Sequence, residues 1–345
     1  MARHSKITRG GYRRRAVVVG VTVVVTIALV CTAAAISATL MHAAASRQTV
    51  SASSVSSRRA ARSSASSRTA TGQPQSNPSP SDTPDSRETA RLNRQQTLDS
   101  LSAQLQQKIS GYDGTWQVYI EDLPTGAAIS INSHQQYSAS VIKLMVMLAV
   151  FQRMHDGMFS DTAATDNLLT EMITISSNEA TNTLVDQLGG GDTQVGYDAV
   201  NTIARQYGFT QSHLNQRMGD LTGTTGKQTS VNDQGRFLAA ACRGQLVSAE
   251  YSQRMIDLML GQQRRSKIPA GLPTQISVAN KTGESPGVEN DSAMVFAADD
   301  GRTIAGSQPG QGDYVIAVMS EGVGSSNTAQ ADIRDISASA WTALR

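Results

Sequence analysis

Apolar residues follow three different patterns along the 345-residue chain. A continuous apolar run without any charge extends from Ala16 to Met41. Residues 42–86 are rich in Ser, Ala, Arg, Pro, Gln and Thr and have no periodic apolar face. From Arg87 to the C-terminus, apolar residues recur with the periods of helices and strands. The pattern therefore predicts one folded domain over residues 87–345, preceded by two segments of a different kind.

The uncharged run over residues 16–41 is long enough for a transmembrane helix. Roughly 20 apolar residues span a bilayer, whereas the core of a signal peptide has about 7–15. Residues 1–15 contain basic residues and no acidic one, which favours a cytoplasmic N-terminus and an extracytoplasmic folded domain. We therefore expect a basic cytoplasmic segment followed by a single-pass anchor in the cell membrane. A long cleavable signal peptide, with small residues at His42–Ser46, is the alternative.

The segment of residues 42–86 is expected to be a flexible stalk. Its Pro- and Ser-rich composition cannot bury enough apolar surface to offset the conformational entropy of the chain. Such segments serve as tethers between a membrane anchor and a folded domain.

The order of the periodic segments predicts an α+β fold. Leu98, Leu101, Leu105 and Ile109 are spaced by three or four residues, as in a helix. One antiparallel sheet with flanking terminal helices and a separate helical lobe fits the whole order. The expected elements are a helix before residue 110, a hairpin over 116–133, a helical block over 140–260, strands at 275–283, 291–299 and 313–322, and a helix over 327–345.

Charge, cysteine and histidine content exclude several functions. The net charge is +2, and beyond the first 86 residues no basic stripe of the kind that binds nucleic acid is present. Cys242 lies on an apolar helix face, so we expect it to pack in the core, and Cys31 lies in the membrane segment. The five histidines are scattered without ligand spacing, and we expect neither a metal site nor a cofactor.

The sequence Ser140-Val-Ile-Lys143 is the first candidate for chemistry. Residues three apart share one helix face, so Lys143 lies beside Ser140. A serine hydroxyl needs a base to become a nucleophile, and a lysine can act as that base when burial lowers its pKa. The following apolar run "LMVMLAVF" predicts such burial. By itself the motif is common, and a chance serine beside a lysine that reaches to solvent is the competing interpretation.

Two further motifs strengthen this hypothesis. Ser176-Ser177-Asn178 lies between two helical stretches, and Lys281-Thr282-Gly283 ends a predicted strand. With Ser140-x-x-Lys143, these motifs follow the order found in serine enzymes that recognise penicillin. The folded domain thus resembles the class A β-lactamase and penicillin-binding-protein superfamily, and its β-lactamase-related serine hydrolase branch most. The stretches "SVIKL", "NKTGE", "KIPAGLP" and "VENDSAMV" carry this resemblance.

The resemblance implies a β-lactamase/transpeptidase-like fold and a role for each motif residue. Ser140 would be the acylated nucleophile, Lys143 its base, and Ser176 the group that passes a proton to the leaving nitrogen. Asn178 would bind the amide side chain of the ligand. The remaining implied substrate-binding roles are carboxylate binding by Lys281 and Thr282, space for the ligand at Gly283, and an oxyanion hole formed by the backbone N–H groups of Ser140 and Glu284.

Two departures from the family pattern concern the chemistry. Ser177 stands where Asp is usual in the middle motif, so a contact that anchors a loop is expected to be lost. Class A β-lactamases carry a loop glutamate in a Glu-x-x-Leu-Asn sequence that activates the hydrolytic water. The nearest counterpart here is Gln211, in "QSHLN", which cannot accept a proton from water. Acylation without rapid release is the expected consequence.

The sequence thus predicts a membrane-anchored, extracytoplasmic serine hydrolase of β-lactamase type. Its expected partners are β-lactams or the stem peptides of peptidoglycan. The alternatives are a D-alanyl-D-alanine carboxypeptidase or esterase, and a non-enzymatic module that binds wall fragments or antibiotic.

Overall fold

The computed structural model describes residues 84–297 and 305–345. The expected cytoplasmic segment, the membrane helix over residues 16–41 and nearly all of the expected stalk lie outside these residues. Helix α2 begins at Pro84, within the last residues assigned to the stalk. Among the described helices, none combines the length and the apolar character needed to cross a bilayer.

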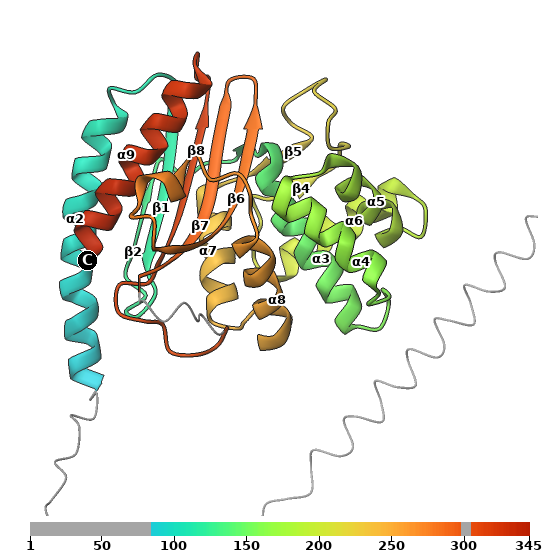
Figure 1. Cartoon of the computed structure of the whole chain (residues 1–345), viewed down its shortest axis with the longest axis horizontal. Helices are drawn as coiled ribbons and strands as arrows, with labels where there is room; N and C mark the ends of the chain where they lie inside the picture. The colour runs from blue at the N-terminus through green and yellow to red at the C-terminus, as the bar shows by residue number, and fades with distance from the viewer. Residues whose placement is uncertain (1–83, 298–304) are drawn as a thin grey trace, which may run out of the picture. The chain divides into compact units, whose positions relative to one another are not determined.

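A five-stranded antiparallel sheet forms the centre of the domain (Figure 1). All neighbouring strands pair antiparallel, and the predicted hairpin of the first two strands is confirmed. The strand order is β2-β1-β8-β7-β6, which leaves β6 at one edge. The strands are β1 Thr115–Asp122, β2 Ala128–Ile131, β6 Ser277–Ser285, β7 Val288–Phe296 and β8 Tyr314–Glu321.

Side chains of the central strands alternate between two apolar cores. In β8, Ile316 and Val318 belong to one buried cluster, whereas Val315 and Ala317 belong to the other. Successive residues of a strand point to opposite faces, so a sheet covered on both sides needs apolar residues at nearly every position.

Helices cover both faces of the sheet, as predicted for the terminal ones (Figure 1). Helices α2 (Pro84–Ile109) and α9 (Ser326–Leu344) pack together on one face. The ion pair between Lys108 and Asp335 joins them at 2.7 Å. Helix α7 (Val231–Cys242) packs against β1, β7 and β8 on the other face, next to α8 (Ala249–Leu260).

The helical lobe is built around α3 (Lys143–His155), which follows the 3₁₀ turn η1 (Ala139–Ile142). Residues 143–151 of α3 are all buried, although the first of them is a lysine. Because a helix with apolar residues on all sides must be enclosed, its neighbours surround it. They are the π-helix η2 (Glu171–Ile175), α5 (Asn178–Leu188) and α6 (Thr193–Gln206), while α4 (Ala163–Thr170) packs against η2 and α5.

The sequence did not predict a small second sheet, which has one strand just before the block of residues 140–260 and two strands within it. Its strands β3 (Gln136–Tyr137), β5 (Lys227–Thr229) and β4 (His213–Leu214) pair antiparallel in that order. Strands of two or three residues are too short for a periodic pattern to reveal them. A further 3₁₀ turn, η3 (Ile268–Gly271), leads into β6.

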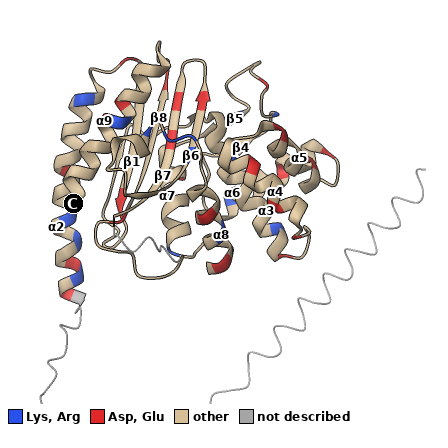
Figure 2. Cartoon of the chain, in the orientation of Figure 1, with Lys and Arg blue, Asp and Glu red and all other residues tan. Residues whose placement is uncertain are grey.

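The burial of Cys242 and the distribution of charged residues can be compared with the structure. Cys242 is buried, as predicted, and burial raises the pKa of its thiol well above the ordinary value. Basic and acidic residues are interspersed over the described helices (Figure 2).

We expect Gly235→Ala to destabilise the domain, because Gly235 is where α7 approaches the sheet. An added Cβ would lie 1.9 Å from Cδ1 of Tyr119, so the helix or the ring must shift. Overpacking of this kind costs about 1–3 kcal/mol, against a gain of about 1 kcal/mol in helix propensity. Thermal unfolding measures the effect. Gly223→Ala is the matched control, since nothing lies within 4 Å of its added Cβ, and equal melting temperatures for the two variants would contradict this packing.

Candidate active site

Ser140 lies in the 3₁₀ turn η1, immediately before α3. The preceding residue, Ala139, has φ of 46°, in the left-handed region that a residue with a Cβ rarely adopts. Strain of this kind persists only where the surrounding structure enforces it, and it is frequent at functional sites. Asn290 of β7 contributes to this constraint, because its Nδ2 donates a hydrogen bond of 3.0 Å to the carbonyl of Ser138.

Lys143, the first residue of α3, is fully buried. Its Nζ donates hydrogen bonds to the carbonyl of Ser176 at 2.6 Å and to Oδ1 of Asn178 at 2.9 Å. Burial lowers the pKa of Lys143 to about 7, and the nearby guanidinium of Arg264 adds to the decrease, whereas Glu284 opposes it. A substantial fraction of Lys143 is therefore neutral near pH 7 and able to accept a proton.

Ser176 ends the π-helix η2 and has φ of 63° and ψ of 36°, again left-handed. A single π turn and a strained serine are both features that are over-represented at functional sites. This conformation directs both the carbonyl and the hydroxyl of Ser176 toward Lys143, at 2.6 and 3.2 Å.

Lys281 of β6 approaches the same hydroxyl from the sheet. Its Nζ donates to Oγ of Ser176 at 2.9 Å and to the carbonyl of Thr282 at 2.8 Å. Burial, and then the charge of Lys143, hold the pKa of Lys281 well below its ordinary value. The three sequence motifs thus meet at one point, with Ser176 between two buried amines.

Gly283 explains how β6 comes close to Ser140. A Cβ at this position would lie 2.9 Å from the carbonyl oxygen of Ser138 and 3.0 Å from the backbone nitrogen of Ser140. Only glycine allows this approach of the strand edge to the 3₁₀ turn. Residues 283 and 284 of the strand are therefore adjacent to the backbone of the expected nucleophile.

The hydroxyl groups of Ser140 and Thr282 have no hydrogen-bond partner among the described residues. Oγ1 of Thr282 is buried, while Ser140 is partly exposed. Buried polar groups in native proteins are normally hydrogen-bonded, so an unpaired hydroxyl beside Lys281 is suited to a ligand. Catalytic hydrogen bonds are often formed only in the substrate complex, which applies to the expected contact of Ser140 with Lys143.

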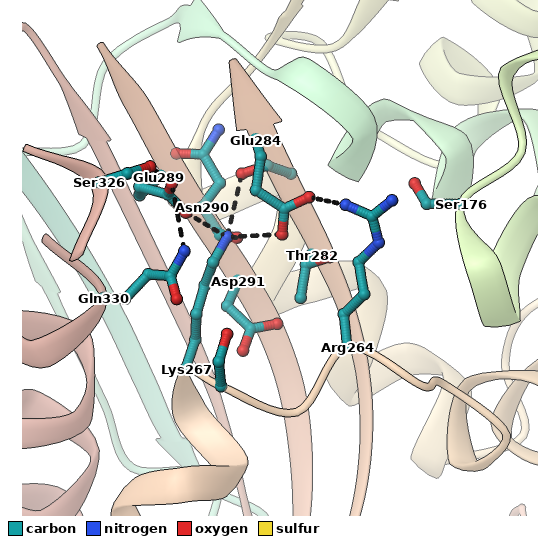
Figure 3. A network of polar contacts seen from close by, with 12 residues as sticks. Ser176, Arg264, Lys267, Thr282, Glu284, Glu289, Asn290, Asp291, Ser326 and Gln330 are labelled. Atoms are coloured by element: carbon teal, nitrogen blue, oxygen red, sulfur yellow. Dashed lines mark hydrogen bonds and ion pairs between the residues drawn. The ribbon is translucent and has the colours of Figure 1, made fainter. Parts of the chain in front are cut away.

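Glu284 has a side chain that the sequence hypothesis did not consider. Its carboxylate pairs with Lys267 at 3.0 Å and with Arg264 at 2.5 Å (Figure 3). Burial alone would raise the pKa of Glu284, but Lys267 and Arg264 together hold this pKa below its ordinary value. Lys267 is the first residue of the "KIPAGLP" stretch that carries the family resemblance, but no role was assigned to it, and Arg264 lies in none of the quoted stretches.

The structure does not place Gln211 at the site. Its side-chain oxygen accepts a hydrogen bond of 2.7 Å from Ser230, the residue that caps α7. The loop segment next to the site lies further along the chain: a Cβ on Gly219 would be 3.5 Å from Nδ2 of Asn178. The neighbouring carboxylate of Asp220 accepts hydrogen bonds from the backbone and hydroxyl of Thr222, within its own turn.

Other residues anchor this loop in place of the usual aspartate. Ser177 caps α5 instead, accepting a hydrogen bond from the N–H of Ala180. Asn182, one turn into α5, exchanges two hydrogen bonds with the backbone of Met218, at 2.9 and 3.1 Å. The ion pair of Arg217 with Asp186 adds a second tie between the loop and the helix. The loop is thus fixed, but by contacts that the motif comparison could not reveal.

The fold and this geometry agree with comparisons to known proteins. The family model described as "Beta-lactamase enzyme family" matches residues 100–165 and 160–344. The chain belongs to the beta-lactamase enzyme family. The expected superfamily and fold class are thereby confirmed, and with them a serine hydrolase of class A β-lactamase type, which acts on cyclic amides. No match was found among curated proteins.

The chain matches several solved structures of this fold over almost the full length of those structures. The structure of PBP-A matches with a TM-score of 0.61 and 24% identity, over 71% of this chain and 95% of PBP-A. A PBP-A mutant in an acyl-enzyme complex with penicillin G matches with 0.62 and 25%, over 71% and 96%. A β-lactamase from Sphaerobacter thermophilus matches with 0.59 and 24%, over 71% and 96%.

A metal centre has no set of ligands in the residues that the structure describes. Within residues 84–297 and 305–345, no group of three His, Cys, Asp or Glu side chains could hold a metal ion. The polar groups gathered at the site are amines, hydroxyls and one amide, and they suit acyl transfer through a serine.

Removal of Arg264 should raise the pKa of Lys143. A cation near an amine disfavours the protonated form, so its loss in Arg264→Gln moves the midpoint upward from about 7. NMR of lysines labelled with ¹³C at Cε measures the titration, and the resonance is assigned by its loss in Lys143→Met. Arg205→Gln, on the exposed surface of α6, is the control and should leave the midpoint unchanged. An equal midpoint in Arg264→Gln and wild-type protein would refute the electrostatic coupling.

Proposed function

We propose that this chain is a membrane-anchored, extracytoplasmic serine hydrolase that is acylated at Ser140 by β-lactams or by related amides of cell-wall peptides. Acyl release from the enzyme is slow. The observation that carries the proposal is the position of the Ser176 hydroxyl, 3.2 Å from Nζ of Lys143 and 2.9 Å from Nζ of Lys281.

In the proposed acylation, Oγ of Ser140 attacks the carbonyl carbon of the amide while neutral Lys143 accepts its proton. The C–N bond then breaks, and the leaving nitrogen receives a proton from Ser176, which is resupplied by Lys143. Lys281 stabilises the hydroxyl of Ser176 during this transfer and, with Thr282, binds the ligand carboxylate. The low pKa of Lys143 supports the first step, because a base with a pKa near the working pH is the most effective one.

Slow release follows from the groups near the expected position of the hydrolytic water. The loop segment beside Asn178 is Gly219, which has no side chain to act as a base. Asp220 is engaged with Thr222, and Gln211 lies at the cap of α7. The PBP-A mutant that was captured with penicillin G as an acyl-enzyme supports the view that this fold can hold such an ester.

The membrane anchor is part of the proposal and rests on the sequence of residues 16–41. A hydrolase held outside the membrane by a stalk would meet both peptidoglycan and antibiotic. The anchor distinguishes the proposed protein from a secreted enzyme. Fractionation of cells that express the full chain tests it, since recovery of the mature protein in the medium would favour a cleaved signal peptide.

We expect a pulse of penicillin to increase the mass of the full-length chain, kept in detergent, by one intact penicillin. The adduct should persist after free penicillin is removed, because the loop segment beside Asn178 has at Gly219 no side chain that could activate water. Mass spectrometry of the intact protein at increasing times measures formation and loss. Ser140→Ala should show no adduct. An unmodified wild-type mass throughout would contradict the proposal, whereas rapid loss with steady nitrocefin hydrolysis would contradict slow release alone.

The two alternative functions predict different outcomes. A D-alanyl-D-alanine carboxypeptidase would release D-alanine from a wall pentapeptide in a reaction that requires Ser140 and Lys143. A binding module would take up the ligand equally well in wild-type protein and in Ser140→Ala. The burial of two lysine amines around one hydroxyl favours an enzyme, because a simple binding site would gain nothing from depressing the pKa of a lysine.

A further inference from the structure

Lys267 is a fully buried lysine outside the three motifs. Its Nζ lies inside a set of four oxygens: the carbonyls of Gly283 and Asn290, at 3.2 and 3.0 Å, and the carboxylates of Glu284 and Glu289, at 3.0 and 2.7 Å. Figure 3 shows this arrangement between β6, β7 and the turn before β6. An ammonium group is costly to bury unless it is paired and hydrogen-bonded, and here both conditions are met.

The carbonyl of Gly283 is half of a peptide group whose other half is the N–H of Glu284. A peptide group is planar and trans, so its C=O and N–H point in opposite directions, and the described residues contain no cis peptide bond. β6 is the edge strand, with β7 on one side only. With the Gly283 carbonyl directed at Lys267, the N–H of Glu284 points to the opposite side of the strand. At Gly283 the strand edge packs against the backbone of Ser138 and Ser140.

We propose that Lys267 is a positioning residue of the oxyanion hole: it orients and polarises the Gly283–Glu284 peptide so that the N–H of Glu284 becomes a stronger donor toward the acylated carbonyl. This inference rests on the proposed function. An ammonium that donates to a carbonyl forms a charge-assisted hydrogen bond, which is roughly twice as strong as a neutral one. Hydrogen bonds at the two ends of one peptide strengthen each other by about 10–30%.

The surroundings of Lys267 fit a fixed electrostatic role. Glu289 is itself held by the first two turns of α9, where Ser326 and Gln330 donate hydrogen bonds to its carboxylate. The four oxygens come from two adjacent strands, so Lys267 also locks the register of β6 at residues 283 and 284. Arg264 shares only the outer side of the network, since it pairs with Glu284 but has no contact with the Gly283 carbonyl.

A single NMR signal can report on this peptide, because the dipeptide Gly–Glu occurs only once in the chain, at residues 283–284. Labelling glycine with ¹³C at the carbonyl and glutamate with ¹⁵N gives one correlation in the full-length chain, kept in detergent. Lys267→Met should move both nuclei upfield, because the carbonyl loses its charged donor. Arg264→Gln is the matched control: it also removes a cation from Glu284, but the correlation should stay near its wild-type position.

The same variants are compared in acylation by penicillin. We expect Lys267→Met to lower the acylation rate constant about tenfold. This decrease is smaller than the roughly 10²–10³-fold decrease in rate on complete loss of an oxyanion-hole donor. The affinity of the non-covalent complex should stay unchanged. Rates are taken on the high-pH plateau, where Lys143 is deprotonated, so that a changed pKa of Lys143 in Arg264→Gln does not contribute.

The outcomes separate this inference from the proposed function. An unshifted correlation, or a plateau rate equal to that of wild-type protein, overturns the role of Lys267. Failure of wild-type protein to react with penicillin overturns the proposed function, while the correlation still decides whether Lys267 polarises the peptide. If Lys267→Met does not fold, the double variant Lys267→Met/Glu289→Gln keeps the local charge balanced and serves in both measurements.

Discussion

Two buried lysine amines share one serine hydroxyl, and this arrangement sets the requirements for the rest of the domain. Lys143 comes from a helix at the centre of the helical lobe, Lys281 from the edge of the sheet, and Ser176 from a strained turn between them. Burial favours the neutral form of both lysines, and a neighbouring cation adds to this effect: Arg264 for Lys143, and Lys143 for Lys281. The fold must therefore hold the helical lobe and the sheet together rigidly, because the positive charges of Lys143 and Lys281 oppose their common contact with Ser176.

Glu284 is the carboxylate that raises the pKa of both lysines, and its own pairing decides how strong this effect is. An unpaired carboxylate there would favour the protonated lysines and work against a neutral base. Lys267 and Arg264 neutralise it from two sides, one buried and one at the surface. The pKa of Lys143 is lowered first by burial and then by Arg264, and the carboxylate that opposes this decrease has its charge already compensated. The ion pairs of Glu284 with Lys267 and Arg264 thus influence the protonation state of Lys143.

The sequence was sufficient to predict the sheet, the terminal helices and the meeting of the three motifs. The short apolar run of β8 and the helical spacing in α2 are local patterns, and local patterns can be read from one sequence. The left-handed Ser176, the strands of two or three residues and the cage around Lys267 could not be predicted in this way. Each depends on contacts between distant segments, such as Lys267 with Glu289, and no periodicity records such contacts. Gln211 was a wrong counterpart for the loop glutamate for the same reason: its motif resembles the family loop, but the fold places it at the cap of α7.

Acylation and release are assigned to different parts of the structure. The groups proposed for acylation lie on η1, α3 and β6 and at the end of η2. The segment beside Asn178, where a base for water would be needed, belongs to a loop that is held by Asn182 and Arg217. Lys227 also fixes this loop, because its buried ammonium group donates hydrogen bonds to the carbonyls of Arg217 and Asp220. Because the loop is anchored through its backbone, its side chains can vary without disturbing the acylation site. In the proposed function, a carboxylate introduced on this loop would therefore change the rate of acyl release while the acylation site stays as it is.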